Sequence, residues 1–117
     1  MRWTMDIPSW SPTPLNKLIN SHWGTATKLK AMDKDVIARS KMVGGIPDAT
    51  CKRRVELLIV HPPGKRFPDP DAFHKSLGDA LVHCGLLRND SHLWVELTQP
   101  EFARGESLRT VITLTDV

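Results

Sequence analysis

The sequence lacks the long apolar segments of exported and membrane-spanning proteins. No apolar run approaches the ~20 residues that a transmembrane helix needs, and Met1 to Asp6 show neither the apolar core nor the cleavage site of a signal peptide. Internal repeats and low-complexity tracts are absent as well. The chain has 117 residues, of which 40% are hydrophobic and 25% charged, which is the size and composition of one ordinary globular domain. We therefore expect a single cytoplasmic domain over residues 1–117.

Ligands for a zinc-type metal centre are also scarce. The two cysteines, Cys51 and Cys84, have no Cys or His at a metal-finger offset, and two thiols in a reducing compartment are typically small core residues. The five histidines form no HxxxH pair or other dense ligand spacing. We assign the cysteines no chemistry, and we rank the histidines below the carboxylates as candidate ligands.

Charge of the two signs is divided unevenly along the chain. Residues 1–66 hold 12 Lys and Arg against 5 acidic residues, whereas residues 67–117 hold 4 against 8, so the halves carry +7 and −4 within a net charge of +3. A basic half indicates contact with a polyanion, and close aspartates in an acidic half indicate a bound cation. A protein that binds both phosphate and a metal fits this distribution.

Two amphipathic patterns predict helices. Over residues 25–43, apolar side chains recur at intervals of three, four and seven, at Leu29, Met32, Val36 and Val43. Over residues 71–84 the predicted apolar side consists of Phe73, Leu77, Ala80, Leu81 and Cys84. The sequence Asp69-Pro70-Asp71 supplies an N-cap and a proline at the first helical position of the second helix, and Gly85 is placed to end it.

Residues 54–61 are rich in branched apolar residues and predict a buried strand. Residues 3–7, 93–98 and 107–115 are also predicted to be strands. We expect the last two to form a hairpin around residues 100–106. Prolines 8, 12 and 14 make the remainder of residues 1–24 an extended N-terminal arm. Together the elements predict an α+β fold with one small mixed sheet and two main helices.

The basic residues of the first half are candidates for binding a phosphate backbone. Lys30, Lys34 and Lys41 fall within about 40° of one another on the first helix, so their ammonium groups project from one stripe. The alternative is an ordinary solvated helix face. The predicted DNA-binding residues are Lys17, Lys28, Lys30, Lys34, Lys52, Arg53, Arg54, Lys65 and Arg66.

Chemistry is predicted at Asp69, Asp71, Lys75 and Asp90. The first two flank a proline at a helix N-terminus, whose partial positive charge keeps carboxylates ionised, as a hard cation requires. Asp90, on the loop after the helix, is placed to complete the site. Lys75, one turn beyond Asp71, is placed to stabilise charge on a phosphate. The alternative is that the aspartates only cap the helix, form ion pairs and make a turn.

A wider pattern runs from His61 to Trp94. It contains, in order, Asp69-Pro70-Asp71, Lys75, Asp79-Ala80-Leu81, Gly85 and Asn89-Asp90. This block resembles the RusA-type Holliday junction resolvase family, and the resemblance extends over about residues 12–114. Residues 12–17 resemble the family's N-terminal arm, which bears proline and asparagine, and His22-Trp23 before a basic helix is similar to phage-encoded members.

The resemblance implies a RusA-like homodimeric endonuclease that cuts four-way DNA junctions symmetrically in recombination and repair. It implies that Asp69, Asp71 and Asp90 bind Mg²⁺, with Mn²⁺ as an alternative, and that Lys75 is catalytic; the role of Asp79 is left open. Many members carry Asn at the position of Ala72 and an acidic residue at that of Asn89, so both changes remove polar groups beside the proposed metal. We expect no membrane partner and no small-molecule cofactor.

Two other functions fit the same residues. In a non-catalytic DNA-binding protein, the basic helix would bind the backbone and the aspartates would have structural roles only. A metal-dependent nuclease of broader range would cut flaps, forks or plain duplex as well as it cuts junctions.

Overall fold

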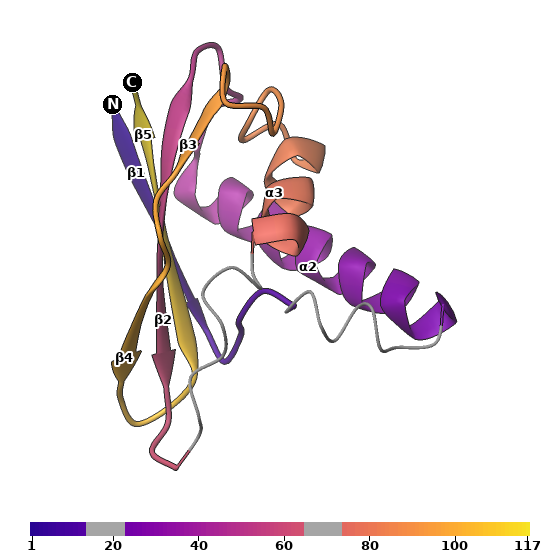
Figure 1. The fold of residues 1–117 in the computed structure, drawn as a ribbon, viewed down its shortest axis with the longest axis vertical. Helices are drawn as coiled ribbons and strands as arrows, with labels where there is room; N and C mark the ends of the chain where they lie inside the picture. Colours follow the sequence, from indigo (N-terminus) through magenta and orange to yellow (C-terminus); the bar gives the residue numbers. More distant parts are fainter. Residues whose placement is uncertain (14–22, 65–73) are drawn as a thin grey trace.

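The sheet and helices form two layers, seen edge-on in Figure 1. The computed structural model describes residues 1–13, 23–64 and 74–117. The strands are β1 (Arg2–Pro8), β2 (Arg53–His61), β3 (Val95–Leu97), β4 (Glu101–Arg104) and β5 (Arg109–Asp116). The helices are α2 (Trp23–Gly44) and α3 (His74–His83), and within the described residues no helix is long and apolar enough to cross a membrane.

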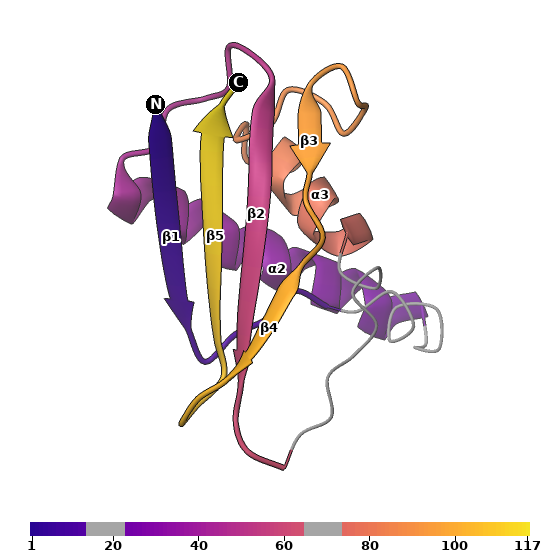
Figure 2. The same ribbon diagram turned by 60° about the vertical axis from the view of Figure 1, so that its left-hand side comes forward.

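The sheet is mixed, and its strand order is β1-β5-β2-β3, with β4 also paired to β2 (Figure 2). β5 lies between β1 and β2 and is antiparallel to both. β3 and β4 follow one another along the other edge of β2, and both run parallel to it. The predicted α+β fold with a small mixed sheet is confirmed.

The predicted hairpin between the last two strands is wrong. β3 and β5 lie on opposite sides of β2, and β4 occupies residues that were predicted to form the hairpin turn. The sequence predicted both strands at about their observed positions, but nearness in sequence does not determine which strands pair. Parallel addition to β2 becomes possible because the chain enters β3 from the end of α3, as in a crossover connection.

The core lies between the sheet and the two helices (Figure 1). Alternate residues of β2 are buried, beginning with Arg53 and ending with His61, and the buried side faces the helices. The residues between them, beginning with Arg54, therefore point to the opposite face of the sheet. Ile112 and Leu114 of β5 are fully buried beside Leu57 and Val55 of β2.

α3 follows the predicted pattern closely. Leu77, Ala80 and Leu81 are buried, as the apolar stripe predicted. Gly85 adopts the left-handed conformation, with φ of 79°, and ends the helix where the sequence placed a terminator. A Cβ at this position would also lie 3.0 Å from Asp48 Oδ1, so both backbone and space favour glycine.

α2 exists where it was predicted, but it buries a different side. Met32 and Val43 of the predicted stripe are 61% and 91% exposed, while Asp33 and Ile37 are buried. Asp33 and Ile37 each follow a stripe residue by one position, which is about 100° around the helix. Hydrophobic periodicity missed this side because one of its central residues is an aspartate.

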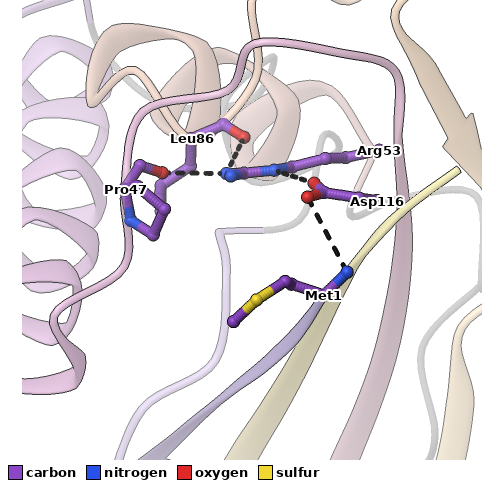
Figure 3. Close-up of polar contacts among 5 residues, drawn as sticks. All are labelled: Met1, Pro47, Arg53, Leu86 and Asp116. Atoms are coloured by element: carbon purple, nitrogen blue, oxygen red, sulfur yellow. Dashed lines mark hydrogen bonds and ion pairs between the residues drawn. The ribbon is translucent and has the colours of Figure 1, made fainter.

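Arg53 is a buried cation at the start of β2, and only 2% of its surface is exposed. Its guanidinium donates to Asp116 Oδ1 at 2.9 Å and to the carbonyl oxygens of Pro47 and Leu86 at 3.1 and 3.0 Å (Figure 3). It also stacks 4.6 Å from the ring centre of Trp3. Arg53 therefore joins the two terminal strands to the loops that precede β2 and follow α3.

Two ion pairs make the folded state sensitive to acid. The hydrogen bond from Arg53 lowers the pKa of Asp116 below its ordinary value of 3.8, and that from Lys41 lowers the pKa of Asp48 in the same way. Both carboxyls bind protons less readily when folded. Their stabilisation is therefore complete above pH 3.8 and is lost as the pH falls through the lowered folded-state values.

We expect the urea midpoint of unfolding to fall between about pH 5 and pH 2, and Asp116→Asn to remove part of this dependence. Chemical denaturation at a series of pH values measures both effects. An Asp116→Asn profile parallel to that of the wild type would show that Asp116 contributes nothing to the acid sensitivity.

Candidate functional site

The predicted metal ligands are only partly covered by the structure. Asp69 and Asp71 lie outside the described residues, as do Lys17, Lys65 and Arg66 of the predicted DNA contacts. The backbone of Lys75 belongs to the first turn of α3, but its side chain is outside the description. Asp90 is described and is exposed on the loop after α3.

Asp90 lines a hollow of about 420 Å³ between α2, α3 and the loop that follows α3. Its other lining residues come from all three segments: Lys34, Asp79, Val82, His83 and Asn89. The hollow therefore brings a lysine of the basic helix together with two carboxylates of the acidic half. These residues are up to 56 positions apart in the sequence, counted from Lys34 to Asp90.

The packing of the helices explains this arrangement. Leu77, Ala80 and Leu81 of α3 point into the core, so Asp79 lies on the outer side of the helix, next to α2. Asp33 and Ile37, one turn apart, are the buried residues on the core side of α2. Lys34 follows Asp33 directly and is half-buried at the boundary with α3.

The loop after α3 is bound to Arg53 near its start and contains a local turn around Asp90. The buried guanidinium of Arg53 binds the carbonyl of Leu86, and Ser91 donates its backbone N–H to Asn89 Oδ1 at 3.0 Å. The second bond is an Asx turn, which fixes the backbone on either side of Asp90. The Asn89 side chain thus has a structural role in presenting Asp90.

The charges of the hollow suit a phosphate bound through a cation. Asp79 and Asp90 supply hard oxygen ligands of the type that Mg²⁺ and Mn²⁺ prefer, and Lys34 supplies a positive charge for an anion. Among the described residues, no three His, Cys, Asp or Glu side chains converge on one point. Since two of the three predicted ligands are not described, the three-aspartate centre stays a prediction.

Another hollow, of about 320 Å³, lies on the sheet face away from the helices. Its charged lining residues are Glu56 and Glu101, and the rest are apolar or neutral. Two carboxylates without a cation repel phosphate. The hollow at Lys34 is therefore the better candidate for nucleic-acid chemistry.

The predicted DNA contacts do not share one surface. Lys28 and Lys30 are exposed on α2, and Lys34 lies on the same helix beside the hollow. Arg54 points to the opposite face of the sheet, where it pairs with Glu96 at 3.2 Å. Lys52 is half-buried just before β2.

The assignment of Arg53 as a DNA contact is wrong. Its guanidinium is buried and donates to Asp116 and two backbone carbonyls, so it is not available to phosphate. The run Lys52-Arg53-Arg54 gave three adjacent cations in sequence. Strand alternation sends the second into the core and the third to the far face.

Neither cysteine forms a disulfide, and burial raises the pKa of the Cys84 thiol. A thiol with a raised pKa is protonated at neutral pH and is a poor nucleophile.

Sequence reasoning did not anticipate that Lys34 and Asp90 would line one hollow. It assigned Lys34 to the DNA backbone and Asp90 to the metal. Comparison with known proteins adds no further guide: no protein-family model matches the chain, and no curated protein sequence does.

Proposed function

We propose that the protein is a Mg²⁺-dependent endodeoxyribonuclease that resolves four-way DNA junctions. The observation that carries the proposal is the hollow that is lined by Lys34 of α2 together with Asp79 and Asp90. The order and spacing of Asp69, Asp71, Lys75 and Asp90 in the sequence support it, through the resemblance to RusA-type resolvases. Mn²⁺ is expected to substitute for Mg²⁺ because both accept carboxylate oxygen.

In this proposal the three predicted metal ligands, Lys75 and Lys34 have separate tasks, and the role of Asp79 is left open. Asp69, Asp71 and Asp90 would hold the metal, which supplies Lewis-acid stabilisation of the phosphate and a nucleophilic hydroxide for in-line attack. Lys75 would stabilise the negative charge that develops on the phosphate oxygens. Lys34 would neutralise a phosphate next to the site. Cleavage would leave 5′-phosphate and 3′-hydroxyl ends.

The basic surface of α2 would bind the backbone without reading bases. Lys28 and Lys30 are exposed there and lie on the same helix as Lys34. Paired cuts in a two-fold symmetric junction require two related sites, and we therefore propose a homodimer. Recognition would depend on the shape of the junction.

A synthetic four-way junction tests the proposal directly. We expect paired, symmetric cuts with Mg²⁺, and binding without cutting in Ca²⁺ or EDTA. Flap, fork and plain duplex substrates run in parallel test the breadth of the activity. Binding with no cutting in Mg²⁺ or Mn²⁺ would favour the non-catalytic DNA-binding alternative, and equal cutting of all substrates would favour a general branched-DNA nuclease.

The role of Lys34 can be separated from general basicity of the helix. Lys34→Gln is expected to weaken junction binding about threefold to tenfold at low salt and to reduce the slope of log affinity against log salt by about one. Fluorescence anisotropy in Ca²⁺ at several salt concentrations measures both.

Arg39→Gln is the control for this variant. Arg39 is on the same helix, but it is exposed and pairs with Asp35 at 2.8 Å, and it does not line the hollow. The Arg39→Gln variant should bind the junction with an affinity within twofold of the wild type. Equal losses in the two variants would show that only net charge matters.

A further inference from the structure

Asp33 is a buried carboxylate that the proposed chemistry does not use. Only 3% of its surface is exposed, and it lies on the core side of α2. A buried carboxylate is costly unless hydrogen bonds replace its hydration. Three donors do so here. Trp10 Nε1 lies 3.2 Å from Oδ1, Thr13 N lies 3.0 Å from Oδ2, and Ser76 Oγ also donates to Oδ2.

These donors come from two separate segments. Trp10 and Thr13 belong to the chain that leaves β1, and Ser76 is the third residue of α3. Asp33 itself is on α2. The side chain of Asp33 therefore links three parts of the fold, because its two oxygens accept all three hydrogen bonds.

The hydrogen bond between Asp33 and Ser76 lies next to residues that the proposed function uses. Ser76 follows Lys75 directly in the first turn of α3, and Asp79 of the hollow is one turn further along. On the other side of the bond, Lys34 follows Asp33 directly in α2. The bond between Asp33 and Ser76 thus fixes the start of α3 against the residue that precedes Lys34.

We infer that Asp33 is a positioning residue for cleavage, which acts through Ser76 to hold the first turn of α3 in register with Lys34 of α2. The inference rests on the proposed function. Asp33 touches neither metal nor DNA in this arrangement. Its effect is on the rate of cleavage, because misplacement of a reacting group by about 1 Å can slow a reaction about a hundredfold.

Ser76→Ala tests this role, because it removes one donor to Asp33 and leaves the other two. We expect the single-turnover cleavage rate of a four-way junction in Mg²⁺ to fall about tenfold to a hundredfold, while junction affinity in Ca²⁺ stays within twofold. Hydrogen exchange should become faster in the first turn of α3. Ser76→Cys, which keeps the volume with a weaker donor, is the second variant if the alanine variant does not fold.

Trp10→Phe is the matched control. It also removes one donor from Asp33, but from the segment after β1 instead of from α3. It should lower stability while leaving the cleavage rate within threefold and the exchange of α3 unchanged. Equal losses of cleavage rate in the Trp10 and Ser76 variants would overturn the inference, and so would unchanged cleavage rates in both Ser76 variants. In either case, cutting by the wild type would leave the proposed function intact. A wild type that does not cut would overturn both.

Discussion

Asp90→Asn is expected to lower junction cleavage at least about a hundredfold while junction binding in Ca²⁺ is retained. The substitution keeps the size of the side chain but removes the charge that would hold the metal, and it removes no phosphate contact. Asp90 is exposed, and its backbone is held by the neighbouring Asx turn, so the fold should tolerate the change. Cleavage time courses with Mg²⁺ and gel-shift binding measure the two properties.

Asp6→Asn is the matched control for this experiment. Asp6 is an exposed aspartate of β1 that pairs with Arg109 at 2.8 Å, on the sheet face away from the helices. Exposed ion pairs of this kind contribute little to stability, so its loss should affect neither binding nor cutting. Wild-type cutting by the Asp90 variant would remove Asp90 from the site. Reduced cutting with equally reduced binding would indicate a structural role.

Arg53→Met is expected to produce the largest loss of stability, on the order of 3 kcal/mol, or about 10 °C in the melting temperature. Methionine preserves most of the apolar stem but leaves the carbonyls of Pro47 and Leu86 without this donor, and it leaves Asp116 with only the N-terminal ammonium of Met1 as an ionic partner. Such groups are costly when they are buried and unsatisfied. Urea denaturation followed by circular dichroism measures the change.

The neighbouring residue provides the control for Arg53. Arg54→Met makes the same chemical change one position further along β2, but on the exposed face, where the ion pair with Glu96 is partly solvated. We expect a loss below about 1 kcal/mol. Similar losses at the two positions would contradict the view that burial of the Arg53 network stabilises the fold.

The Arg53 network also bears on the candidate site. The carbonyl of Leu86 that it binds begins the loop on which Asp90 lies. Loss of this bond removes one of the contacts that hold the end of the loop nearest α3, while the backbone bond from Leu86 N to Leu81 O and the Asx turn at Asn89 remain. At temperatures where Arg53→Met is still folded, we therefore expect its cleavage to be reduced more than its binding.

Local patterns in the sequence were sufficient for most of the elements, although not for β4, and for much of the fold class. The apolar stripe and terminal glycine located α3, because Leu77, Leu81 and Gly85 report helix period and left-handed backbone directly. The branched apolar residues of β2 likewise predicted a buried strand, because such side chains pack well on a pleated sheet. For the candidate site, the sequence indicated Asp90 and Lys34 as charged residues of interest, although for separate tasks.

Tertiary structure alone decided which charged residues are buried and which strands pair. Asp33 and Arg53 look like surface residues in sequence, because no local pattern shows that donors from residues 10, 13 and 76, or acceptors from 47, 86 and 116, will surround them. Strand order has the same origin, since pairing depends on contacts between distant segments. The hollow at Lys34 and Asp90 likewise exists only after α2 and α3 pack on the sheet.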